Sequence, residues 1–174
     1  MLRRIAIVSL AAILVAPATA LGQTRRRTKS RPRPAAQSTQ RVSAARTAGA
    51  NKVADQIKFM TRFIYLLGGV ASGIASVDEA ARRNEASPEL IQRNQQSKAT
   101  VRTSIQGFRE SLDRLEIEFR TTPDLQPYYI KLAGSAAGAA KAEELAAANQ
   151  FDPAGRTLLT VINRLTDVLV IMRQ

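Results

Sequence analysis

The sequence predicts an all-α protein: an antiparallel up-down four-helix bundle preceded by a signal peptide and a disordered basic arm. Apolar side chains recur every three or four positions through most of residues 51–174, as in helices that share a core. Helix-capping residues and prolines divide this region into four segments joined by short connections, so successive helices should be antiparallel neighbours. Residues 1–50 lack this pattern and differ sharply in charge.

Residues 1–20 are typical of a secretory signal peptide. Arg3 and Arg4 precede an apolar run over residues 5–16, and Ala18-Thr19-Ala20 fits a cleavage site near residues 20–22. The apolar run is too short to cross a bilayer of about 30 Å comfortably. We therefore expect an exported protein, located in the periplasm or outside the cell.

Residues 21–50 form a predicted Arg- and Pro-rich arm with eight basic and no acidic side chains, whereas residues 51–174 contain 16 basic and 14 acidic ones. The arm has little to bury and is expected to be disordered, although residues 38–50 are rich in Ala and could be partly helical. It can bind an anionic membrane surface or a polyanion, or act as a passive linker. The candidate anion-binding residues are Arg25, Arg26, Arg27, Lys29, Arg31 and Arg33.

The first helix is expected over residues 51–83, starting at Asn51, a good N-cap residue. Gly68, Gly69 and Gly73 weaken it by about 1 kcal/mol each relative to Ala. Residues 76–79 match a capping box, so the helix could break there. Its apolar seam is Val53, Ile57, Met60, Ile64, Leu67, Ala71 and Ile74, and a second row, Phe59, Phe63, Leu66 and Val70, is expected to widen the buried stripe.

The second helix is expected over residues 88–121, with Ser87 as N-cap and Pro88 at the first helical position. Its seam loses apolar residues between positions 92 and 100. At about 1.5 Å per residue the first two helices are longer than the last two, so their hairpin should overhang. Asn94, Gln95 and Gln96 are therefore expected to form a solvated polar tip rather than a buried layer. The seam is Val101, Ile105, Phe108, Leu112, Leu115 and Phe119.

The third helix is expected over residues 128–149 and the fourth over residues 153–173, where Asp152 and Pro153 give a start signal. The fourth helix has the seam Leu158, Ile162, Leu165, Leu169 and Met172. Two pairs of glycines at i,i+4 spacing are predicted to allow close helix packing: Gly69 with Gly73, and Gly134 with Gly138. In a membrane the same spacing is typical of helix association.

The chain has no His and no Cys, which excludes Ser-His-Asp and Cys-His nucleophiles, thiolate or imidazole zinc sites, haem held by either residue, and disulfides. The acidic residues of the second helix are expected to form an ion-paired, solvated face rather than a metal site; they are Glu110, Asp113, Glu116 and Glu118. We predict no catalytic residue, metal or cofactor, and no small-molecule substrate is evident.

Together these features predict a non-enzymatic exported helical-bundle protein, held by its cationic arm to an anionic envelope component or polyanion, with the polar tip available to an unknown protein partner. One alternative is a membrane-active or self-associating helical protein that uses its small-residue faces. A second is a cytoplasmic nucleic-acid-binding protein that retains its N-terminal segment. The oligomeric state stays open.

Overall fold

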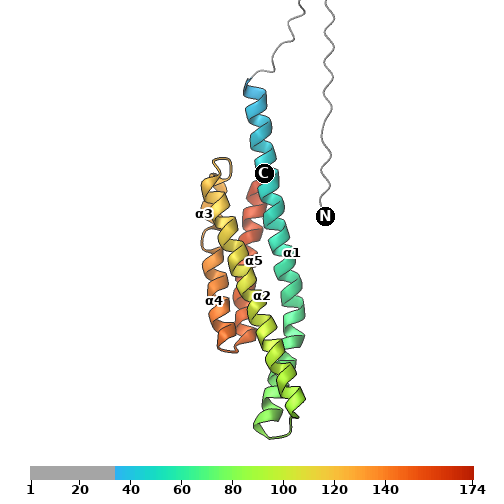
Figure 1. Cartoon of the computed structure of the whole chain (residues 1–174). Helices are drawn as coiled ribbons and strands as arrows, with labels where there is room; N and C mark the ends of the chain where they lie inside the picture. The colour runs from blue at the N-terminus through green and yellow to red at the C-terminus, as the bar shows by residue number, and fades with distance from the viewer. Residues whose placement is uncertain (1–33) are drawn as a thin grey trace, which may run out of the picture. The chain divides into compact units, whose positions relative to one another are not determined.

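A computed structural model describes residues 34–174 of the chain (Figure 1). The predicted signal peptide and the six candidate anion-binding residues lie outside the described residues. Within residues 34–174 the structure contains only helices, which confirms the all-α prediction. The helices are α1 (Pro34–Arg82), α2 (Pro88–Thr121), α3 (Gln126–Leu132), α4 (Ser135–Ala147) and α5 (Phe151–Arg173).

The long helices lie side by side and alternate in direction (Figure 1). α1 packs against α2 and α5, and α4 packs against the same two helices from the other side. The short α3 contacts α2 and α5. These neighbours are the ones expected for an up-down bundle with short connections, and we refer to the packed helices as the bundle.

The predicted seams do form the core. Large side chains with no more than 2% exposure line it from three helices: Val53, Met60, Ile105, Leu112, Phe119, Leu158, Leu165 and Met172. Phe63 of α1 meets Phe108 of α2 edge to face, with ring centroids 5.2 Å apart. The second row of α1 is different, because Phe59, Leu66 and Val70 are 61%, 58% and 40% exposed. The expectation that this row widens the buried stripe is therefore wrong except at Phe63.

α1 begins at Pro34 and not near Asn51, so residues 34–50, expected in the disordered arm, are helical. Extending an existing helix costs far less than nucleating one, and this stretch is rich in Ala, the best helix former. At Gly49 the helix passes close to the core: an added Cβ would lie 2.9 Å from Leu125 Cδ2 and 3.2 Å from Met172 Cε. α1 also continues through the capping-box sequence at residues 76–79.

The third predicted helix is divided into α3 and α4. Gly134 adopts φ +87°, in the left-handed region, and separates the two helices. Glycine takes this conformation without the steric cost of a Cβ atom. α5 starts two residues earlier than expected, with Phe151 buried and without a side-chain cap from Asp152. Ser87 does cap α2 as predicted, since its hydroxyl accepts a hydrogen bond from Leu90 N at 3.3 Å.

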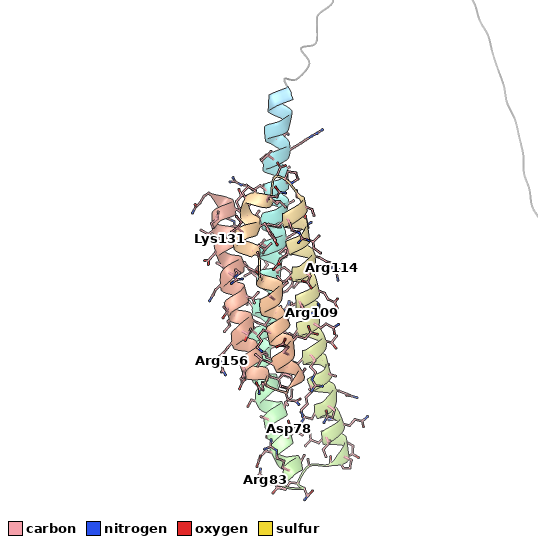
Figure 2. All side chains as sticks on the ribbon, turned by 90° about the vertical axis from the view of Figure 1, so that its left-hand side faces the viewer. Asp78, Arg83, Arg109, Arg114, Lys131 and Arg156 are labelled. Atoms are coloured by element: carbon pink, nitrogen blue, oxygen red, sulfur yellow. The ribbon has the colours of Figure 1, made fainter. Side chains whose placement is uncertain are left out.

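Both ends of α1 reach past the other helices. At one end the α1–α2 hairpin extends beyond the α4–α5 turn, as the length argument predicts, and at the other end the start of α1 continues past the bundle (Figures 1 and 2). The bundle therefore leaves parts of α1 and α2 without coverage from α4 and α5.

Candidate functional site

Residues 34–48, which we call the α1 extension, carry the chain away from the bundle toward the predicted arm (Figure 1). Arg41 is exposed and Arg46 is half-buried, and from residue 40 onward the first buried positions are Gly49 and Ala50. The extension contains no acidic residue. It thus continues the positive charge of residues 25–33 on a helical support.

The polar residues of the hairpin are not all solvated. Gln95 and Gln96 are exposed as expected, but Asn94 is 7% exposed, so its assignment to a solvated tip is wrong. Asn94 Nδ2 donates to Asp78 Oδ1 at 2.7 Å and to the carbonyl of Ile74 at 3.4 Å. Lys98 Nζ lies 2.6 Å from the same Asp78 oxygen.

We call Asp78, Asn94 and Lys98 the hairpin polar cluster. It occupies the level at which the apolar seams of α1 and α2 end, close to the α4–α5 turn, and Figure 2 shows Asp78 in the overhanging hairpin. A buried amine or amide needs partners because removal from water is otherwise costly. Asp78 supplies an acceptor to both, so the cluster fixes the register of α1 on α2.

The four predicted close-packing glycines fall into two groups. An added Cβ at Gly138 would lie 2.6 Å from Val161 Cγ2, so α4 and α5 approach closely there. At Gly134 the conflict would be with Arg164, whose Nη1 donates to the carbonyl of Ala133 at 2.8 Å. Gly69 and Gly73 have no such neighbour within 4 Å, and the close-packing interpretation is wrong for both.

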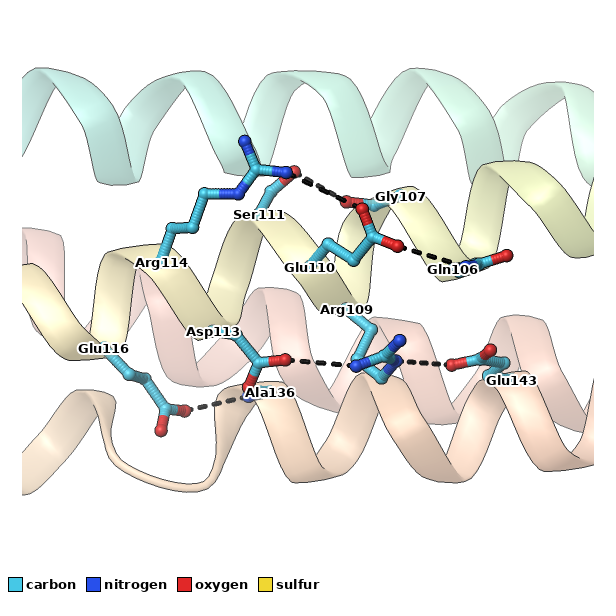
Figure 3. Close-up of polar contacts among 10 residues, drawn as sticks. All are labelled: Gln106, Gly107, Arg109, Glu110, Ser111, Asp113, Arg114, Glu116, Ala136 and Glu143. Atoms are coloured by element: carbon cyan, nitrogen blue, oxygen red, sulfur yellow. Dashed lines mark hydrogen bonds and ion pairs between the residues drawn. The ribbon is translucent and has the colours of Figure 1, made fainter.

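The acidic residues of α2 make ion pairs and hydrogen bonds, several of them between helices (Figure 3). Arg109 lies between Asp113, at 3.2 Å, and Glu143 of α4, at 2.6 Å. The hydrogen bond with Glu143 and its charge raise the pKa of Arg109 above its usual value. Glu116 accepts a hydrogen bond from Ala136 N at 2.8 Å, at the first turn of α4, instead of belonging only to a solvated face.

Two further interhelical contacts complete this network. Glu118 meets Lys52 of α1, with Nζ to Oε1 at 2.5 Å. Arg102 donates to the carbonyl of Ala146 at 3.2 Å and so binds the carboxyl end of α4. These contacts align helices and do not enclose a reaction site. Within residues 34–174 no group of three acidic residues is placed to hold a metal ion.

The missed feature is an open groove between α1 and α2, whose lining includes the buried core residues Leu67 and Val101. Its volume is about 570 Å³. The α1 wall is apolar and includes Phe63, Leu66 and Val70, and the α2 wall is polar and includes Arg93 and Thr100. We call it the α1–α2 groove. The sequence held one signal for it: the second apolar row of α1 has no matching apolar row on α2.

A shallower hollow continues the groove toward the hairpin, lined by Val70, Gly73, Val77 and Leu90 among others. Within the described residues, one helical stretch, Gln40–Arg82, is long and apolar enough to cross a membrane by length and composition, and only 22% of its apolar window is buried. The core helix of a soluble protein can pass the same test. The result therefore shows only that α1 has more apolar residues than the bundle buries.

Comparisons with protein-family models, with curated proteins and with solved structures found no match to this chain.

Proposed function

We propose that this chain is an exported, non-enzymatic helical-bundle protein that its basic N-terminal arm tethers to an anionic component of the cell envelope. The observation that carries the proposal is the uneven charge: eight basic and no acidic residues in positions 21–50, against 16 basic and 14 acidic ones in residues 51–174. A cationic segment of this kind binds anionic lipid headgroups at about 1 kcal/mol per basic residue near the surface.

The α1 extension supports this proposal. It joins the arm to the bundle through a helix that leaves the core at Gly49, and its exposed Arg41 adds to the charge of the arm. The bundle is then held by one end of α1, while the α1–α2 hairpin at the other end of the same helix is available to a partner (Figure 1). Export itself rests on the signal-like residues 1–20.

N-terminal sequencing of the purified chain tests export first. A start near residues 20–22 is expected, and a retained Met1 would favour the cytoplasmic nucleic-acid-binding alternative instead. Cosedimentation with vesicles containing anionic lipid then tests the arm. Replacing its six basic residues with Gln should abolish salt-sensitive binding, because counterion release and headgroup attraction both scale with these charges.

A charge-matched control separates the arm from net charge. Six exposed basic residues of the bundle are changed to Gln instead: Arg114, Arg120, Lys131, Lys141, Arg156 and Arg173. This variant should retain most vesicle binding. Equal loss in both variants would show a general charge effect, and equal retention of binding by the arm variant would contradict the tether.

A further inference from the structure

The outward side of α1 carries large apolar side chains that the bundle leaves uncovered. Phe59 is 61% exposed, Tyr65 85% and Leu66 58%. Scattered single apolar residues are normal on protein surfaces, but these lie within about two turns of one helix. Leu66 lines the α1–α2 groove, and Phe59 lines a second hollow between α1 and α2. Within residues 34–174 no packed element covers them, so they are accessible to a partner outside the bundle.

Within residues 34–174 the glycines of the same stretch have no close packing neighbour. Gly68, Gly69 and Gly73 each have open space where a Cβ would be placed. In a helix interior each costs about 1 kcal/mol relative to Ala. The exposed surface of α1 therefore combines large apolar side chains with glycines, where the backbone has no side chain over it.

The charges around the groove identify the chemistry of what it meets. α1 has no acidic residue between Asp55 and Asp78, and α2 has none between Glu89 and Glu110. Arg62 of α1 is exposed, and Arg93 is exposed and lines the groove from α2. Within residues 34–174 neither guanidinium is within 4.0 Å of a carboxylate.

The other basic residues of these two stretches are engaged. Lys98 is held by Asp78, Arg109 by Glu143, and Arg102 by the carboxyl end of α4. Lys58 lies 3.2 Å from Asp55 in an exposed pair. The unneutralised charge of these two stretches is therefore positive: Arg93 lines the groove, and Arg62 is exposed on α1.

We infer that the outward side of α1, from Phe59 to Gly73, together with the α1–α2 groove, docks on the surface of an anionic lipid bilayer. Aromatic and aliphatic side chains enter the boundary between headgroups and acyl chains, and exposed basic residues contact the headgroups, as in interfacial amphipathic helices. Arg62 and Arg93 supply those headgroup contacts. The inference takes its anionic partner from the proposed function, but it depends on different residues.

The chain contains no Trp, which gives a direct test. A single Trp replaces Phe59, and in a matched variant it replaces Ile117, which is 52% exposed but belongs to α2 and lines neither hollow between α1 and α2 near Phe59 and Leu66. The mature chain is titrated with neutral and with anionic vesicles. Phe59→Trp should show a blue-shifted emission with anionic vesicles only, and Ile117→Trp should show no shift.

Affinity measurements extend the test. Leu66→Ser should weaken binding to anionic vesicles about tenfold or more, as expected for loss of a buried apolar side chain. Arg62→Gln and Arg93→Gln should each weaken it about fivefold. Ile117→Ser should leave it unchanged. Circular dichroism and urea unfolding of each variant identify losses of vesicle affinity that come from misfolding. Where a variant unfolds, a Trp substitution at the same position is used instead and its emission is measured.

The same titrations separate this inference from the arm. If the arm variant cosediments as well as the wild-type chain and Phe59→Trp still shifts with anionic lipid, the docking surface stands and the tether fails. If the wild-type chain cosediments without any shift at Phe59→Trp, the arm alone binds and the inference is overturned. A shift that appears without vesicles and depends on protein concentration would also overturn it, because a second copy of the chain would then cover this side of α1.

Discussion

Asp78→Ala is the substitution with the largest expected effect in the hairpin. It would leave Lys98, whose side chain is 8% exposed, as a buried cation without its acceptor, and Asn94 would lose its shorter hydrogen bond. Removing one partner of a fully buried ion pair costs about 3–5 kcal/mol. The Asp78 side chain is 28% exposed, so water can reach part of the vacated site. We therefore expect a loss of about 2–3 kcal/mol in the free energy of unfolding.

Urea unfolding followed by circular dichroism measures this loss, and the neighbouring Glu79 provides the control. Glu79 pairs with Arg82 at 3.2 Å on the surface, with both side chains at least half exposed. Glu79→Ala should cost about 0–1 kcal/mol. Adding Lys98→Met to Asp78→Ala should recover much of the loss, because the uncompensated charge is then absent. Equal effects of Asp78→Ala and Glu79→Ala would refute a buried hairpin polar cluster.

Three smaller predictions use the same unfolding assay. Gly69→Ala should stabilise the protein by about 1 kcal/mol, because Ala is the better helix former and its Cβ meets open space; a destabilised variant would show that α1 is packed there. Gly138→Ala should destabilise it by about 1–2 kcal/mol, because the Cβ would lie 2.6 Å from Val161 Cγ2, and Val161→Ala should reduce that cost. At the start of α2, hydrogen bonds from the residue's own backbone N–H and from Ser87 lower the pKa of Glu89. The folded state therefore favours the charged carboxylate, so Glu89→Gln should lose stability above the ordinary carboxyl pKa, and the difference should vanish as pH falls through the lowered pKa; a difference independent of pH would contradict this.

The core could be predicted from the sequence because it depends on periodic burial. The seam residues Val53, Ile105 and Leu165 recur at helical spacing, and all three are fully buried. The overhang of the first hairpin could also be predicted from the sequence, because the length of a helix is proportional to its number of residues. The Ser87 N-cap followed from local chemistry that needs no tertiary contact.

The features that sequence reasoning missed depend on contacts between helices. Asn94 looked solvated because its neighbours are polar, and only the approach of α1 places Asp78 beside it. Gly69 and Gly138 have the same i,i+4 spacing to a second glycine, but only Gly138 has a close neighbour. The early start of α1 was missed because its first residues need no burial once the remainder of the helix is formed.

The second apolar row of α1 shows the same limit at the candidate site. A helix buries a wide apolar stripe only where its neighbours cover the full width of that stripe. The neighbours of α1 are α2 and α5, and they leave the side that carries Phe59 and Leu66 exposed. Hydrophobicity alone could not distinguish a core row from a docking row. In the structure the row is exposed beside an α2 wall that includes the polar residues Arg93 and Thr100.

Thiol labelling of single-Cys variants along α1 tests the central claim most directly, since the chain has no Cys of its own. Inward positions Met60 and Leu67 should be protected with or without anionic vesicles, because the bundle covers them. Outward positions Phe59, Leu66 and Gly73 should react rapidly in solution and become protected when anionic vesicles are added. Outward positions that are protected without vesicles, or that stay reactive with them, would contradict an outer side of α1 that the bundle leaves free for a lipid surface.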